Sequence, residues 1–66
     1  MFIEVTDSIT KVTNMVNVSL VLCFQPTVDG TARCYMRFSN ANEGDDFIIT
    51  AESYDEVKSK IWKALQ

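Results

Sequence analysis

Two arginines and a tyrosine alternate in the second half of this 66-residue chain, at Arg33, Tyr35 and Arg37. Residues two apart in an extended strand point to the same face, so these three side chains are expected to share one surface of a sheet. Gln25, on the neighbouring strand, should lie beside them. Aromatic and guanidinium groups on a sheet bind single-stranded nucleic acids by stacking, and the same residue types are enriched in protein interfaces. Three interpretations follow: a protein-binding surface, a nucleic-acid-binding surface or an ordinary solvated face.

The charge of the chain favours a protein partner over nucleic acid. Six basic and nine acidic residues give a formal net charge of −3, and the pI is about 4.6. Nucleic-acid binding draws much of its affinity from neutralised phosphates, which suits a basic chain. We therefore expect a protein partner first, and a nucleic-acid-binding module as the alternative.

Trp62 is a second candidate contact residue. It falls to one side of the apolar stripe of the predicted C-terminal helix. An exposed tryptophan there would anchor a partner or a second copy of the chain. The other interpretation is that Trp62 folds over the sheet edge and extends a small core.

Side chains suited to covalent chemistry are few. The chain has two cysteines, Cys23 and Cys34, and no histidine. The usual Ser-His-Asp and Cys-His arrangements therefore cannot form, and a structural zinc site would lack its normal four nitrogen or sulfur ligands. Only Cys23, which is expected on the face of the arginines, is a candidate reactive thiol. We predict no enzymatic activity, no cofactor and no metal.

Residues 39–46 (SNANEGDD) form a polar, acidic loop whose oxygen-bearing side chains suggest a test for calcium binding. The oxygen ligands on offer are Asn40, Asn42, Glu43, Asp45 and Asp46. An EF-hand loop needs glycine at its sixth position and glutamate at its twelfth. Counted from Asn40, these positions hold Asp45 and Ala51, so the match fails and a solvated loop is expected.

The hydrophobic pattern predicts an α+β fold, in which an antiparallel β-meander of four to five strands packs on one C-terminal amphipathic helix. Segments rich in β-branched and aromatic residues alternate between polar and apolar positions, as half-buried strands do. The predicted strands span residues 2–6, 9–13, 20–27, 31–38 and 47–51. All of them belong to a single domain over residues 1–66.

Asp29-Gly30 marks a hairpin, and its loop length decides which side chains share a face. A two-residue loop would pair Val28 with Thr31, whereas a three-residue loop would pair Thr27 with Thr31. The second register separates apolar from polar residues better, and we predict it. Its apolar face holds Leu20, Leu22, Phe24, Ala32, Cys34, Met36 and Phe38. Its outer face holds Val21, Cys23, Gln25, Arg33, Tyr35 and Arg37. The two cysteines then point to opposite faces, which excludes a disulfide between them.

The closing helix is predicted over residues 54–65. Ser53 and Glu56 form a capping box, in which the serine oxygen accepts from the amide of Glu56 and the Glu56 carboxylate reaches back to the amide of Ser53. Acidic residues come first and lysines later, which matches the helix dipole. The stripe expected to face the sheet consists of Tyr54, Val57, Ile61, Ala64 and Leu65.

Three pieces of the chain carry a resemblance: Met1–Thr6 (MFIEVT), Val16–Val21 (VNVSLV) and Glu52–Val57 (ESYDEV) with Ile61. Together they resemble a family of very short bacterial proteins associated with flagellar and swarming motility, and short phage-encoded proteins of similar layout. The resemblance implies a prokaryotic or phage origin and a β-meander followed by a helix. It implies no site residues.

Size and hydropathy set the remaining expectations. A domain of this length buries only about 60% of its unfolded surface, and small scaffolds often gain stability by self-association, so a homo-oligomer is expected. The longest apolar stretch, Met15–Phe24, is too short to span a bilayer, and no basic segment precedes it as in a signal peptide. We expect a cytoplasmic protein, in a bacterium or an infected host cell, with reduced thiols.

The leading hypothesis is a non-enzymatic interaction or regulatory protein that binds a protein partner, for example as an inhibitor of a host system. The candidate contact residues are Trp62, Tyr35, Arg33, Arg37 and Gln25.

Overall fold

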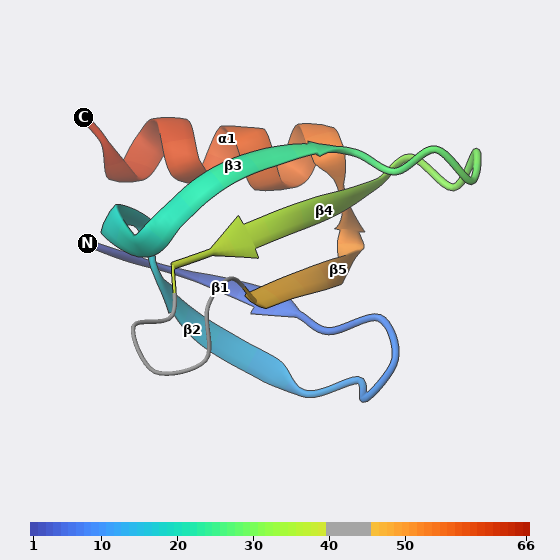
Figure 1. Cartoon of the computed structure of the whole chain (residues 1–66). Coiled ribbons are helices and arrows are strands. Elements are labelled where there is room, and N and C mark those ends of the chain that lie inside the picture. Colours follow the sequence, from blue (N-terminus) through green and yellow to red (C-terminus); the bar gives the residue numbers. More distant parts are fainter. Residues whose placement is uncertain (40–45) are drawn as a thin grey trace.

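The computed structural model describes residues 1–39 and 46–66. The predicted calcium-ligand candidates from Asn40 to Asp45 lie outside the described residues. Within them, the predicted α+β class is confirmed: five antiparallel strands form two sheets, and one C-terminal helix packs on them (Figure 1). The elements are β1 (Phe2–Thr6), β2 (Thr13–Asn17), the short 3-10 helix η1 (Val18–Leu20), β3 (Val21–Pro26), β4 (Arg33–Phe38), β5 (Asp46–Ser53) and α1 (Tyr54–Ala64).

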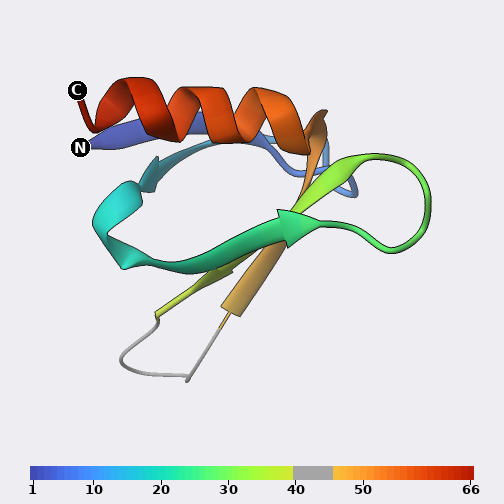
Figure 2. The same cartoon turned by 90° about the horizontal axis from the view of Figure 1, so that it is seen from above.

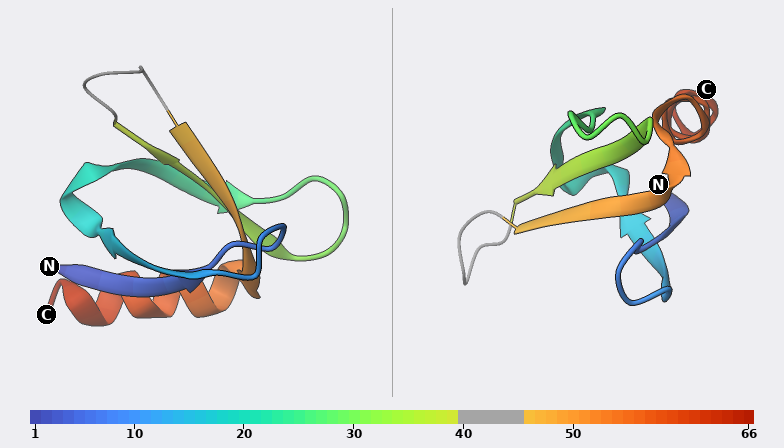
Figure 3. Two further views of the ribbon diagram at one scale, coloured as in Figure 1. Left: turned by 90° about the horizontal axis from the view of Figure 1, so that it is seen from below. Right: turned by 90° about the vertical axis from the view of Figure 1, so that its right-hand side faces the viewer.

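The two sheets are a β1–β2 hairpin and a β3–β4–β5 meander, and they meet where β5 passes β1. Asp7, at the end of β1, forms an antiparallel bridge with Thr50 of β5, and the Ser8 amide donates to the Ile49 carbonyl at 2.9 Å. Helix α1 runs along β1 in the view from above (Figure 2) and is seen end-on beside the strands in Figure 3. No helix among the described residues has the length and apolar run needed to cross a bilayer.

Side-chain hydrogen bonds also link β5 to β1 and β4. The Glu52 carboxylate accepts from the Thr6 amide at 2.8 and 3.1 Å, which joins β5 to β1. Thr50 is fully buried, and its hydroxyl donates to the Glu52 carbonyl while accepting from the Cys34 amide on β4. From α1, the Lys60 ammonium donates to the Glu4 carbonyl at 2.7 Å. These side chains thus bond to backbone amides and carbonyls that have no partner in the short strand ladders.

The prediction of a strand over residues 9–13 is wrong, because a turn occupies residues 8–10 and β2 begins only at Thr13. The Asp7 side chain accepts from the amides of Ile9 and Thr10, and the Asp7 carbonyl accepts from the Lys11 amide. Lys11 takes a left-handed conformation, with φ of 63°. The hydrogen bonds of one aspartate thus override the strand propensity of the alternating residues.

The predicted β3–β4 register is wrong by two residues. Phe24 pairs with Met36, and the Thr27 amide donates to the Arg33 carbonyl, so the loop spans residues 27–32. A shift of two residues preserves the faces, and Phe24, Cys34 and Met36 do face inward as predicted.

A bulge between Val21 and Cys23 reverses the faces at the start of β3. Val21 packs against the core, whereas Leu22 and Leu20 are exposed, contrary to the prediction. Ala32, also predicted to face inward, is exposed in the loop. The hydrophobic pattern could not reveal the bulge, because residues 20–22 are all apolar.

The core lies where the hairpin, the meander and the helix meet. Its buried residues are Ile3, Val5, Val16, Cys34, Met36, Val57 and Ile61. The β1 strand contributes alternate residues, as the pleat requires, and Phe2 and Glu4 point outward. Each of β1, β2, β4 and α1 supplies at least one buried hydrophobic side chain, and β5 supplies the buried Thr50.

Helix α1 begins and packs largely as predicted. The Ser53 hydroxyl accepts from the Glu56 amide at 3.1 Å, and the Glu56 carboxylate meets the Ser53 hydroxyl at 3.4 Å rather than the Ser53 amide. Tyr54 packs on the core, with its ring 5.7 Å from that of Phe24. Leu65, which follows the last helical turn, is exposed, contrary to the prediction.

Candidate functional site

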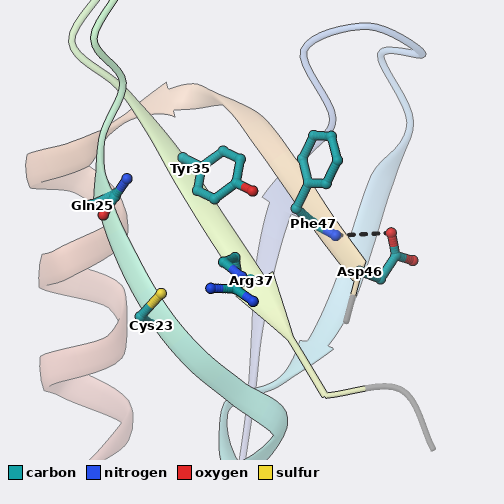
Figure 4. A pocket seen from close by; sticks show the side chains of 6 residues that line it. All are labelled: Cys23, Gln25, Tyr35, Arg37, Asp46 and Phe47. Carbon is teal, nitrogen blue, oxygen red and sulfur yellow. Dashed lines mark hydrogen bonds between the residues drawn. The ribbon is translucent and has the colours of Figure 1, made fainter. Parts of the chain in front are cut away.

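The outward side of the β3–β4–β5 sheet, opposite the core and α1, is the candidate site. Register places two rows of side chains across it: Cys23, Arg37 and Phe47 in one, and Gln25, Tyr35 and Ile49 in the other. These six residues are called the outer face below. Cys23, Gln25, Tyr35, Arg37 and Phe47, with Asp46 at the start of β5, line a shallow hollow of about 460 Å³ (Figure 4).

Two aromatic rings lie at the centre of the outer face. Tyr35 and Phe47 come from adjacent strands and from adjacent rows, so they are diagonal neighbours. Their ring centroids are 5.2 Å apart with an angle of 23° between the planes, which is a stacked arrangement. Such a pair presents a large, rigid apolar surface whose ordering costs little side-chain entropy on binding.

Arg37 stands beside this aromatic pair and points over the hollow (Figure 4). Asp46 closes the end of the hollow, where its carboxylate accepts from the Phe47 amide at 2.8 Å. A guanidinium next to aromatic rings can pair with a carboxylate or phosphate through two parallel hydrogen bonds. The site therefore combines an apolar platform with a directional donor.

A second hollow, of about 290 Å³, continues from the first across Tyr35 and Gln25. Pro26, Val28 and Ile49 give it a largely apolar lining, and the loop over residues 27–32 forms its outer wall. Tyr35 thus lines both hollows.

Asp29 orders the loop that forms this wall. Its carboxylate oxygen Oδ1 accepts from the Thr31 hydroxyl at 2.6 Å, the Thr27 hydroxyl at 2.7 Å and the Thr31 amide at 3.1 Å. These bonds, led by that of the Thr31 hydroxyl, lower the pKa of Asp29 to about 2. Gly30 follows with φ of 80°, a conformation that glycine adopts without strain.

The structure brings together three of the five predicted contact residues, Gln25, Tyr35 and Arg37. Arg33 is the first residue of β4, where a register shift pairs it with Ser53, and it lines neither hollow. Trp62 is 66% exposed on α1, away from both hollows, so the alternative in which it extends the core is wrong.

Sequence reasoning missed Phe47. The residues from Phe47 to Ile49 are all apolar, so periodicity could not decide which of them point outward. The pairing of Phe47 with Arg37 decides it. The outer face therefore carries one aromatic ring more than the sequence predicted.

The two cysteines lie on opposite faces and are both free, which confirms the prediction that they form no disulfide. Cys34 is fully buried, and burial raises the pKa of its thiol to about 11. Cys23 is exposed in the first hollow. Within residues 1–39 and 46–66, no three side chains of histidine, cysteine, aspartate or glutamate converge to hold a metal ion.

Comparisons with family models, with curated proteins and with solved structures found no match. The resemblance to small motility-associated and phage-encoded proteins therefore stays a prediction.

Proposed function

We propose that this chain is a non-enzymatic binding protein that holds a protein partner against its outer face. The observation that carries the proposal is the Tyr35–Phe47 stack at the centre of a sheet face that faces away from the core and α1. Rigid aromatic side chains flanked by an arginine are typical of the residues that dominate binding energy at protein interfaces.

Charge and shape indicate the kind of partner segment. Both arginines of the chain lie on β4, and the other charged residues, four lysines against nine acids, sum to −5. The first hollow is lined by one cation, Arg37, and one anion, Asp46, so it carries charges of both signs. A segment with an apolar side chain for each hollow, packed against the Tyr35–Phe47 stack, fits this surface. A bacterial or phage origin, a cytoplasmic location and the inhibition of a host system belong to the same proposal.

Binding of single-stranded nucleic acid is the second candidate function, and Phe47 is the observation that favours it. Two aromatic rings beside an arginine are the components of a base-stacking platform. Two facts favour a protein instead. Each ring has one of its two faces occupied by the other ring, and the net charge of −3 opposes the approach of a polyanion.

Affinity capture with matched variants tests the proposal. Wild-type protein, Tyr35→Ala and Trp62→Ala are immobilised, and each is exposed to the same bacterial lysate. Thermal melting first verifies that both variants are folded. The proposal expects a partner that wild type and Trp62→Ala retain equally and that Tyr35→Ala loses by at least about tenfold, since truncation of a central aromatic typically removes 2 kcal/mol or more.

Equal retention of that partner by Tyr35→Ala would show that the outer face is not the binding site. Titration of the purified partner at two salt concentrations separates the two functions. Affinity for nucleic acid falls steeply with salt, whereas affinity from aromatic burial changes little. Steep salt dependence with an oligonucleotide ligand would favour the second function.

A further inference from the structure

Among the described residues, strand β2 is an edge strand that pairs with β1 on one side and with no strand on the other. Two hydrogen bonds at the ends of the hairpin show which residues of β2 bond to β1. The Val18 amide donates to the Met1 carbonyl, and the Asp7 amide donates to the Val12 carbonyl. Bonded residues alternate in an antiparallel ladder, so Asn14 and Val16 bond to β1. The backbone groups of Thr13, Met15 and Asn17 consequently point away from β1, and no described residue pairs with them as a strand.

The free edges of β1 and β3 are blunted, whereas that of β2 is not. Pro26 and a bulge interrupt β3, and side chains of Glu52 and Lys60 occupy the backbone groups of β1. Natural sheets protect their edges with charges, prolines and bulges. The β2 sequence TNMVN contains no charge and no proline, and its pairing with β1 is regular over all five residues.

Apolar surface lies on both sides of this edge. Met15 is 63% exposed on the outward side, next to the exposed Phe2. On the inward side, β2 borders a groove of about 240 Å³ whose other walls are Leu20, Phe38 and Ile48. A strand added to β2 would cover side chains on both sides as well as pair the backbone.

We propose that β2 pairs antiparallel with β2 of a second copy of the chain, with the two Met15 residues opposite one another on a two-fold axis. The alternation of bonding groups permits this register, because Thr13, Met15 and Asn17 all point outward and Met15 lies midway between the other two. Met15 then exchanges two bonds with its counterpart. The amide of Asn17 donates to the Thr13 carbonyl at each end, which gives about four backbone hydrogen bonds.

The two-fold register about Met15 and the lack of charge on β2 together favour a second copy as the occupant. A chain of net charge −3 repels itself at most surfaces, but β2 has no charged residue. Among the described residues, the carboxylate that faces β2 across the strand pair is that of Glu4, on β1 opposite Met15. Two β2 strands would separate the Glu4 residues of the two copies by about 14 Å, three strand spacings, which exceeds the Debye length of about 8 Å at physiological salt. The self-paired edge is distinct from the outer face, so this inference and the proposed function stand or fall separately.

The first test is the mass in solution. Light scattering after size exclusion, at loading concentrations up to about 1 mM, should show wild type rising from 7.5 kDa toward twice that mass. Met15→Lys should weaken the dimer by on the order of tenfold to a hundredfold, because it places two like-charged side chains directly opposite one another on Cα atoms about 5.5 Å apart. Val28→Lys, which adds the same charge in the exposed loop between β3 and β4, should dimerise like wild type.

Amide hydrogen exchange on the same samples locates the interface. Concentrated wild type should protect the amides of Met15 and Asn17, which are the donors of the four bonds and exchange freely in dilute wild type and in Met15→Lys. Asn14 and Val16 should be protected in all samples because they bond to β1. A wild-type protein that is monomeric at about 1 mM overturns the proposal. So does a species larger than a dimer, a dimer that survives Met15→Lys, or a dimer in which the amides of Met15 and Asn17 stay unprotected.

Discussion

The side chain of Glu52 links β5 to β1, and the substitution Glu52→Gln tests how much this link contributes to the stability of the fold. Both oxygens of the carboxylate lie within 3.1 Å of the Thr6 amide, and the residue is half-buried. Burial alone would raise the pKa of Glu52. The hydrogen bonds from Thr6, together with the nearby Lys60 ammonium, outweigh burial and hold the pKa below its ordinary value of 4.5. The folded protein therefore favours the charged form.

Glutamine keeps an oxygen that can accept from the Thr6 amide but loses the charge. Hydrogen bonds to charged groups contribute about 1.5–3 kcal/mol and neutral ones about 0.5–1.5 kcal/mol, so Glu52→Gln should lower the free energy of unfolding by about 1 kcal/mol at pH 7. For a domain of this size that corresponds to a fall in Tm of about 4–8 °C. The contribution is complete above pH 4.5, the unfolded pKa, and is lost as the pH falls through the lower folded pKa.

Urea unfolding of wild type and Glu52→Gln at pH 7 and at a series of pH values below 4.5 measures both effects. The difference of about 1 kcal/mol at pH 7 should shrink toward zero in acid, because the wild-type carboxylate is then protonated. Glu4→Gln is the matched control: its carboxylate lies on the exposed side of β1, and it should change stability by less than about 0.5 kcal/mol. Equal stability of wild type and Glu52→Gln at pH 7, or a difference that persists unchanged in acid, would refute the reasoning.

Three further predictions concern single sites. Ala32 has φ of 61°, so Ala32→Gly should raise the free energy of unfolding by about 0.5–1 kcal/mol; a lower Tm would contradict this. A thiol reagent should modify one cysteine of the native protein, Cys23, and both in urea, since Cys34 is buried with its pKa raised to about 11. Mass spectrometry counts the labels, and rapid double labelling without denaturant would show that Cys34 is accessible. Trp62 is 66% exposed, so Trp62→Gln should change stability by less than about 0.5 kcal/mol in urea unfolding, and a larger loss would place the indole in the core.

Local features of the fold were predictable from the sequence. The helix needs only a capping serine, a first turn of acids and an apolar stripe, all within a dozen residues, and it begins at Tyr54 as predicted. The faces of β4 follow from strict alternation, so Arg37 and Tyr35 lie outward and Cys34 and Met36 inward. Such features depend on neighbours along the chain, which the sequence lists directly.

Features set by contacts between distant residues were not predictable. The bulge in β3 moves Val21 into the core and Leu22 out of it, yet residues 20–22 are all apolar and allow either outcome. Phe47 reaches the outer face only because β5 pairs with β4 in one register.

The candidate site shows the same division. Sequence alone placed Gln25, Tyr35 and Arg37 on one face, because alternation along each strand and an even shift between strands leave faces unchanged. Tertiary structure added Phe47 and removed Arg33 and Trp62 from the site, because only pairing between strands and packing of the helix decide which side chains become neighbours. The free edge of β2 was likewise hidden, since a strand's neighbours are a property of the assembled sheet.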